Sequence, residues 1–480
     1  MMESTPQRRE FLHQFGLGGI ALTWMLHQER GLRAESPPKP RATPTPTPTG
    51  LHFPAKAKRV IQIFSPGGVS HLDTFDYKPD LKKYEGQPLP SDRKIETFFN
   101  RPGRLMPTPF RFAQHGQSGR WVSELFPELA KHVDRLTFIQ NMQAKSSNHT
   151  PAAFQMNSGT LFNGFPCMGA WLSYGLGTMN ADLPTFLVMP DPRGLPAGGA
   201  VNWTSGFLPA QHQGVTLRNG PEAVRNLQTP PQVNPQERTD SLAMFRTLEE
   251  GFAATLPGDD ALRARLRSYE LAARMQMRIP EVTSIDSEPE RIRRMYGLER
   301  PETRGFGRNC LLARRFLEKG VRFVQLWHGG AFGSPRINWD AHEDIVDNHR
   351  TQAASLDQPV AALLTDLQER GMLDDTLVLW TTEFGRTPIT EGIGRPGRDH
   401  HPTVFTIWMA GAGLKPGTVY GASDDLGFGP QDDEATTIYD FHATVLHLLG
   451  IDHTKLTYYH NGIRRRLTDV HGEVIEDILA

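Results

Sequence analysis

Histidines and acidic residues gather in a few short stretches of this sequence. "NWDAHED" contains Asp340 and His342, "TTEF" contains Glu383, and "GRDHHP" contains His400 and His401. Neutral imidazole combined with carboxylate suits zinc, manganese or iron, whereas calcium takes more oxygen ligands and fewer histidines. These residues are therefore candidate ligands of a divalent metal, with zinc or manganese favoured over calcium and the number of ions left open.

Two earlier stretches carry further reactive side chains. "VSHLDTFD" offers His71 and Asp73 as ligands for an altered two-metal site, and "SSNHTPAAF" contains His149 and Thr150. A metal nearby would activate the Thr150 hydroxyl as a nucleophile, while His149 would act as a general base or as a ligand. The sequence leaves these roles open.

Cationic side chains close to these stretches could hold an anionic substrate. The candidates are Arg386 in "EFGRTP", Arg398 in "GRDHHP" and Lys78 in "DYKP". A guanidinium group binds a phosphate or carboxylate through two parallel hydrogen bonds. Asp399 or Asp344 would accept the free ring N–H of a ligating histidine.

Each residue also has an ordinary structural interpretation. Asp340 could cap the helix that follows it, and Glu383 with Arg386 could form a loop salt bridge. Two competing motifs fail: "HEDIV" has Val346 where a zincin needs its second histidine, and "GIGRPG" does not open a helix after a strand. The convergence of several clusters is what favours a metal site.

The surrounding pattern predicts the elements that would bring these residues together. Short apolar runs alternate with amphipathic helices, which is typical of a mainly parallel sheet sandwiched by helices. The carboxyl ends of such strands form the ligand-binding edge. We expect one sheet with strands near Val60, Phe138, Phe186, Val324, Val378 and Phe405.

The N-terminal region reads as an export segment. Residues 1–35 pair two arginines with Phe-Leu and a mild apolar run, which resembles a twin-arginine signal, and residues 36–51 form a Pro/Thr-rich linker. The α/β domain spans 52–480, with a helical insert at about 221–298. We expect the twin-arginine translocase as a partner, and a periplasmic or cell-surface location. Membrane contact would occur only through an uncleaved N-terminal segment.

The overall charge limits the range of partners. With 52 Lys+Arg against 53 Asp+Glu, the chain has a formal net charge of −1. That balance gives no general attraction to nucleic acid, so we expect no nucleic-acid partner and a small anionic or ester substrate held by a local site. The two cysteines, Cys167 and Cys310, are expected to be buried thiols.

Several motifs resemble an exported family known as domain of unknown function 1501, within the alkaline phosphatase and sulfatase superfamily. They are "GGVSHLDTFDYKP", "CLLARRFLEKGVRFVQL", "NWDAHEDI", "TEFGRTP" and "GRDHHPTVFTIWMAGAGLKPG". The resemblance implies an alkaline-phosphatase-like α/β fold and an exported, metal-dependent hydrolase of a phosphate or sulfate ester.

The chain also departs from the usual pattern of that superfamily. Ser65 and Pro66 stand where an aspartate ligand is usual, and His149 stands in the register of the sulfatase nucleophile. A single-metal hydrolase, an altered two-metal site and a catalytically degenerate, surface-associated binding or scaffold protein all fit this pattern.

Overall fold

The computed structural model describes residues 50–90, 103–218, 281–330, 337–391 and 395–480, and isolated positions between 234 and 280. The predicted signal at 1–35, nearly all of the linker at 36–51 and most of the predicted insert at 221–298 lie outside the described residues. Among the described residues, no helix combines the length and apolar character needed to span a membrane. Cys167 and Cys310 are buried free thiols, as expected.

One large sheet organises the described part of the chain, and it contains all six predicted strands. Its order is β12-β4-β11-β8-β1-β7-β5-β6, with β13 also paired to β4. The mixed α/β fold with a central sheet is thereby confirmed. The strands are β1 (Arg59–Phe64), β4 (Leu136–Gln143), β5 (Phe186–Met189), β6 (Val215–Thr216), β7 (Phe323–Trp327), β8 (Thr376–Thr381), β11 (Phe405–Gly411), β12 (Val419–Tyr420) and β13 (Thr436–Thr437).

The direction of β11 decides where the histidine pair before it lies. β11 runs antiparallel to both β4 and β8, whereas the other pairs in this sheet are parallel. The start of β11 therefore lies at the edge where β1, β7 and β8 end. Because of this reversal, His400 and His401, which precede β11, lie at the same edge as the residues that follow β1, β7 and β8.

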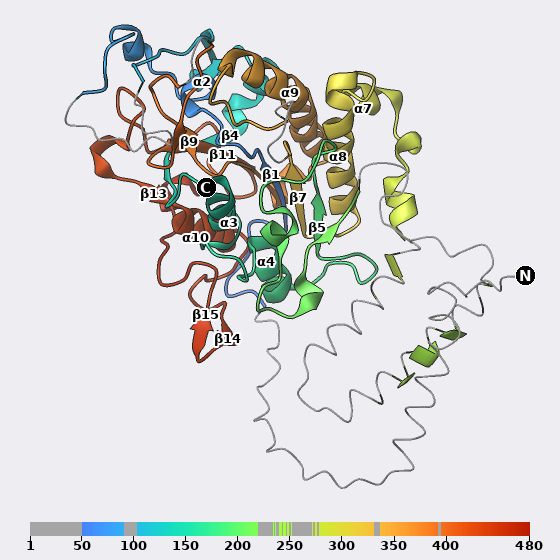
Figure 1. Ribbon diagram of the computed structural model, residues 1–480. Coiled ribbons are helices and arrows are strands. Elements are labelled where there is room, and N and C mark those ends of the chain that lie inside the picture. The colour runs from blue at the N-terminus through green and yellow to red at the C-terminus, as the bar shows by residue number, and fades with distance from the viewer. Residues whose placement is uncertain are drawn as a thin grey trace, which may run out of the picture. The chain divides into compact units, whose positions relative to one another are not determined.

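Alternate side chains of the strands enter two separate cores. Ile61 and Ile63 of β1 pack in one core, under α8 (Pro301–Glu318) and α9 (Ile345–Glu369). Val60 and Phe64 pack in the other, under α3 (His149–Ser158), α4 (Met168–Leu176) and α10 (Ile438–Leu448). The sheet thus has helices on both faces (Figure 1), which explains the continuous apolar runs of its central strands.

The other helices and strands in the described residues are short. They are α2 (His71–Thr74), α7 (Glu290–Met295), β2 (Phe112–His115), β3 (Arg120–Ser123), β9 (Gly385–Arg386), β10 (His400–His401), β14 (Tyr458–His460) and β15 (Ile463–Arg465), with 3-10 turns at 79–82, 129–135, 199–203, 210–212, 285–287, 373–375, 431–433 and 476–478. The antiparallel ladder of β9 and β10 places His400 opposite Arg386. This two-residue ladder fixes the histidine pair beside the carboxyl end of β8.

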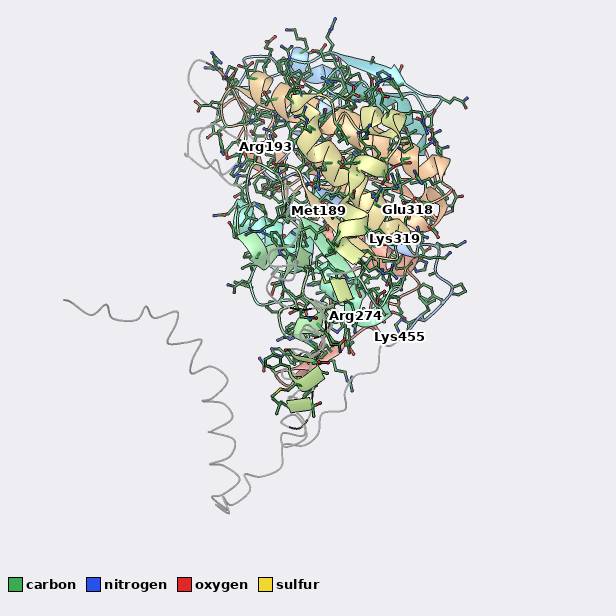
Figure 2. All side chains as sticks on the ribbon, turned by 90° about the vertical axis from the view of Figure 1, so that its right-hand side faces the viewer. Met189, Arg193, Arg274, Glu318, Lys319 and Lys455 are labelled. Atoms are coloured by element: carbon green, nitrogen blue, oxygen red, sulfur yellow. The ribbon has the colours of Figure 1, made fainter. Side chains whose placement is uncertain are left out.

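A buried arginine fastens the two helices of the first core to each other. The guanidinium group of Arg314, on α8, contacts Asp366 of α9 at 2.8 Å and also contacts Glu288 and Glu318. Glu318 and Lys319 mark the end of α8 in Figure 2. These partners keep the pKa of Arg314 above its ordinary value although burial opposes this. These ion pairs therefore hold α8 and α9 together, which helps to fix the position of the loop that precedes α9.

Candidate metal centre

Four side chains converge at the carboxyl edge of the sheet. His149, Asp340, His342 and His400 each present one ligand atom, and these atoms all lie within 4.8 Å of one another. Asp340 Oδ1 is 3.0 Å from His342 Nε2, 3.3 Å from His400 Nε2 and 3.4 Å from His149 Nε2. The Nε2 atoms of His342 and His400 are 2.8 Å apart. This cluster could hold a metal ion.

The spacing of these atoms fits a first-row transition metal. Bonds of about 2.0–2.1 Å in a tetrahedral site place neighbouring ligand atoms about 3.3 Å apart. Four of the six separations, from 2.8 to 3.4 Å, lie around that value, and the other two are no longer than 4.8 Å. Three imidazole nitrogens with one carboxylate oxygen form a donor set for zinc, manganese or iron.

The other nitrogen of each ring is held by an oxygen acceptor. His149 Nδ1 lies 2.7 Å from Glu383 Oε1, His342 Nδ1 lies 2.5 Å from Glu391 Oε2, and His400 Nδ1 lies 2.7 Å from Ser147 O. Because carboxylate and carbonyl oxygens accept hydrogen bonds, each Nδ1 carries the proton and donates it. With a metal bound, each ring would be neutral and would direct its Nε2 lone pair at the ion, the arrangement that orients metal-binding histidines.

Backbone contacts from the loop after β1 position the two carboxylates. Trp339 N donates to Pro66 O at 3.0 Å, and Gly67 N donates to Glu383 Oε1 at 2.8 Å. Gly67 has φ 114°, and a Cβ there would lie 2.4 Å from Asp340 N. Only glycine permits this close approach, because a side chain would push Asp340 away.

Asp340 faces the cluster and does not cap a helix. The residue before α9 is Asp344, in a left-handed conformation, and its side chain makes no capping hydrogen bond. At the other side of the cluster, the side chain of Asn148 caps α3 by accepting from Thr150 N at 3.3 Å. That cap makes His149 the first residue of α3.

The electrostatics of the cluster depend on a buried positive charge. Burial favours the neutral form of Asp340, but the Arg386 guanidinium and three histidine contacts hold the pKa of this carboxyl far below its ordinary value. Burial lowers the pKa of His149 and His342, yet Asp340 and the carboxylates at their Nδ1 atoms raise it overall. The carboxylates around these two rings therefore favour the protonated form of each ring.

His400 behaves differently from the other two histidines. Burial and the neighbouring Arg386 lower the pKa of His400 to about 3. This ring is therefore neutral across the physiological pH range, as a metal ligand must be.

The structure places the other predicted ligands outside this cluster. Neighbouring residues of an extended strand point to opposite sides, so His401 faces away from His400 and its Nε2 contacts Phe428 O. His71 Nε2 contacts Gly427 O at 3.0 Å. Asp73 is held by Arg398 at 2.7 Å. Glu383 supports His149 instead of joining the four-residue group.

The three predicted substrate-binding cations are engaged by the protein itself. Arg386 and Arg398 are fully buried, with their guanidinium groups on backbone carbonyls and on Asp340 and Asp73, respectively. Lys78 contacts Asp76 at 3.0 Å and Ser423 O at 3.0 Å. The sequence does not show that the N–H donors of these three side chains are already hydrogen-bonded to oxygen atoms of the protein itself.

Two supporting residues were not predicted from the sequence. The backbone of Glu391 pairs with that of Gly397, and the side chain of Glu391 contacts His342 at 2.5 Å. Ser147 contributes only its carbonyl, which leaves no trace in side-chain patterns. Of the predicted acceptors, Asp399 Oδ1 is 3.9 Å from His342 Nδ1 and accepts from His400 N, while Asp344 pairs with Arg395.

The fold and this cluster together define a class: an α/β protein whose central sheet carries a histidine-rich candidate metal centre at its carboxyl edge. The chain belongs to the family described as "Protein of unknown function (DUF1501)", which matches residues 57–479. Membership of this family, as predicted from the motifs, is thereby confirmed. No curated protein matches the chain.

Solved structures that align with the chain are distant in sequence. The lipoteichoic acid synthase LtaP from Listeria monocytogenes is 11% identical, with 87% of this chain and 78% of that chain covered and a TM-score of 0.37. A TAB5 alkaline phosphatase variant with Mg bound is 10% identical, with 82% and 98% covered and a TM-score of 0.34. The PsFucS1 sulfatase from Pseudoalteromonas sp. is 13% identical, with 85% and 74% covered and a TM-score of 0.33.

Replacing Glu383 with glutamine should weaken metal binding without abolishing it. The amide keeps the shape of the side chain but removes the charge that orients the His149 ring, and loss of such a partner typically costs about 10–100-fold in metal affinity. Competition for zinc against a chromogenic chelator measures this. Glu302→Gln, at an exposed position of α8, is the matched control, and an equal loss in both variants would contradict the role of Glu383.

Proposed function

We propose that this protein is an exported metal-dependent hydrolase that acts on a phosphate or sulfate ester. The observation that carries the proposal is the convergence of three imidazole Nε2 atoms and Asp340 Oδ1, with each Nδ1 directed to an acceptor.

The residues of the centre would have separate roles in binding the metal and in catalysis. His149, Asp340, His342 and His400 would hold a zinc or manganese ion, which when bound polarises an ester oxygen and lowers the pKa of water toward 7. Glu383 and Glu391 keep two of the rings in the ligating tautomer. Thr150 follows His149 in the first turn of α3, where the positive end of the helix dipole favours an anionic group. Its hydroxyl is the proposed nucleophile.

The proposal is tested by metal content and hydrolysis together. Protein purified from its own exported pool should contain zinc or manganese, and should hydrolyse p-nitrophenyl phosphate, p-nitrophenyl sulfate or a phosphodiester analogue. Chelation and His342→Ala should each remove this activity. Thr150→Ala should lower kcat with the metal retained, because the hydroxyl is not part of the ligand set. Hydrolysis that survives metal removal would refute the proposal.

One observation favours a second candidate function, a catalytically degenerate binding or scaffold protein of the same fold. Arg386 and Arg398, the arginines best placed in sequence to hold an anion, are fully buried and bonded within the protein. A protein that binds metal but hydrolyses none of the ester classes would support this candidate.

Export supplies a prediction that is independent of the site. Changing both Arg8 and Arg9 to lysine should leave the full-length protein in the cytoplasm, because the twin-arginine route requires the arginine pair while lysines keep the charge. Cell fractionation followed by immunoblotting measures this. The control is Arg30→Lys together with Arg33→Lys, which preserves the pair, and unchanged export of the Arg8/Arg9 variant would contradict the signal.

A further inference from the structure

The guanidinium group of Arg386 is enclosed by oxygen atoms. Nε donates to Gly68 O at 2.8 Å, and Nη1 donates to Arg398 O at 2.9 Å. Nη2 donates to Gly67 O and, at 2.6 Å, to Asp340 Oδ1. The side chain is 0% exposed. Three carbonyl oxygens and one carboxylate oxygen therefore surround a single buried positive charge.

This set of oxygens is the kind that a hard cation such as magnesium or calcium takes in proteins. It also shares one atom with the metal cluster, because Asp340 Oδ1 contacts Arg386 on one side and the three histidines on the other. A carboxylate oxygen between two positive centres is what a two-metal site would present. Here the second centre is a covalently attached guanidinium, which carries a permanent charge.

We propose that Arg386 takes the place of a second cation, so that the protein holds one divalent metal beside a fixed positive charge. The inference rests on the proposed function, since it assumes that the four-residue cluster binds metal. It specifies the site further: one exchangeable ion, ligated by nitrogen and oxygen, next to a charge that no chelator can remove.

The neighbouring acidic residues do not provide an independent second site. His342, Glu391 and Asp399 form another group that could hold a metal ion. However, once His342 Nε2 ligates a metal, its Nδ1 keeps the proton that it donates to Glu391 at 2.5 Å. That nitrogen is then no ligand, and only two carboxylates remain.

Metal stoichiometry tests this inference without any activity assay. Purified full-length protein, stripped of metal and titrated with manganese, should saturate at one equivalent per chain and give the EPR spectrum of an isolated ion. Arg386→Lys should also stop at one, because a cation still fills the enclosure. Arg386→Ala should bind a second equivalent, since it leaves an enclosure of oxygens with the charge removed. Its folding is checked by circular dichroism.

The outcomes separate the two proposals. Two manganese ions in the wild-type protein, with the spectrum of a coupled pair, would overturn the role of Arg386 and leave a metal-dependent hydrolase intact. A folded Arg386→Ala variant that stays at one equivalent would also overturn it. No manganese or zinc in the wild-type protein would overturn both. If Arg386→Ala fails to fold, the wild-type stoichiometry and spectrum still decide.

Discussion

From about pH 8 to pH 5, the affinity of the protein for zinc should fall by up to about 100-fold per pH unit, because metal ligands must be deprotonated. In the metal-free protein, Asp340 and the carboxylates at Nδ1 raise the pKa of His149 and His342 above 6.5. Two protons therefore compete with the metal. The competition begins at a higher pH than it would for ordinary histidines.

His400 should contribute little to that slope. The pKa of its ring is lowered to about 3, so it is already neutral when the other two rings take up protons. Zinc affinity measured by chelator competition at several pH values gives the slope directly. His342→Gln should reduce the slope by one proton as well as weakening binding. An affinity that does not change over this range would show that the two histidines are not ligands.

Replacing Arg398 with methionine should destabilise the protein by about 3–5 kcal/mol, the usual cost of removing one partner of a buried ion pair. Arg398 Nε contacts Asp73 Oδ2 at 2.7 Å, and Nη2 contacts Oδ1 at 3.3 Å. Both side chains are fully buried. Burial raises the pKa of the Asp73 carboxyl, but Arg398 holds this pKa below its ordinary value of 3.8 overall. The variant would therefore leave the Asp73 carboxylate buried in the core without a positive partner.

The double variant Asp73→Asn with Arg398→Met should recover part of this loss, because no uncompensated charge remains. Urea unfolding followed by circular dichroism gives the free energies. Arg291→Ala is the control, since its pair with Glu369 is exposed to solvent and should contribute little to the free energy of unfolding. If Arg398→Met costs no more than the control, or if the double variant is worse than the single one, the ion pair lacks the assigned role.

The fold could be predicted because its signals are local. Apolar runs such as "TLVLWTT" and helices ending in glycine are visible in the sequence, and six expected strands lie in one sheet. The antiparallel direction of β11 was not predicted, since it depends on which neighbours the strand pairs with. Without that reversal, the segment containing His400 would lie at the opposite edge of the sheet.

The site could be predicted in part, for a different reason. Residue type identifies a possible ligand, so Asp340, His342 and His400 were among the candidates. It does not identify the partner of a side chain. The sequence suggests that Arg386 binds an anion. In the structure, however, its N–H groups donate hydrogen bonds to backbone carbonyl groups and to Asp340.

The three histidines of the centre come from widely separated segments, and more than half of the 480 residues lie between His149 and His400. The last of them reaches the centre only through the β9–β10 ladder and the start of β11. On the ribosome, the centre therefore cannot assemble until the C-terminal part of the chain has emerged and paired. A metal ion would thus be loaded after translation, in the compartment where the chain completes its folding.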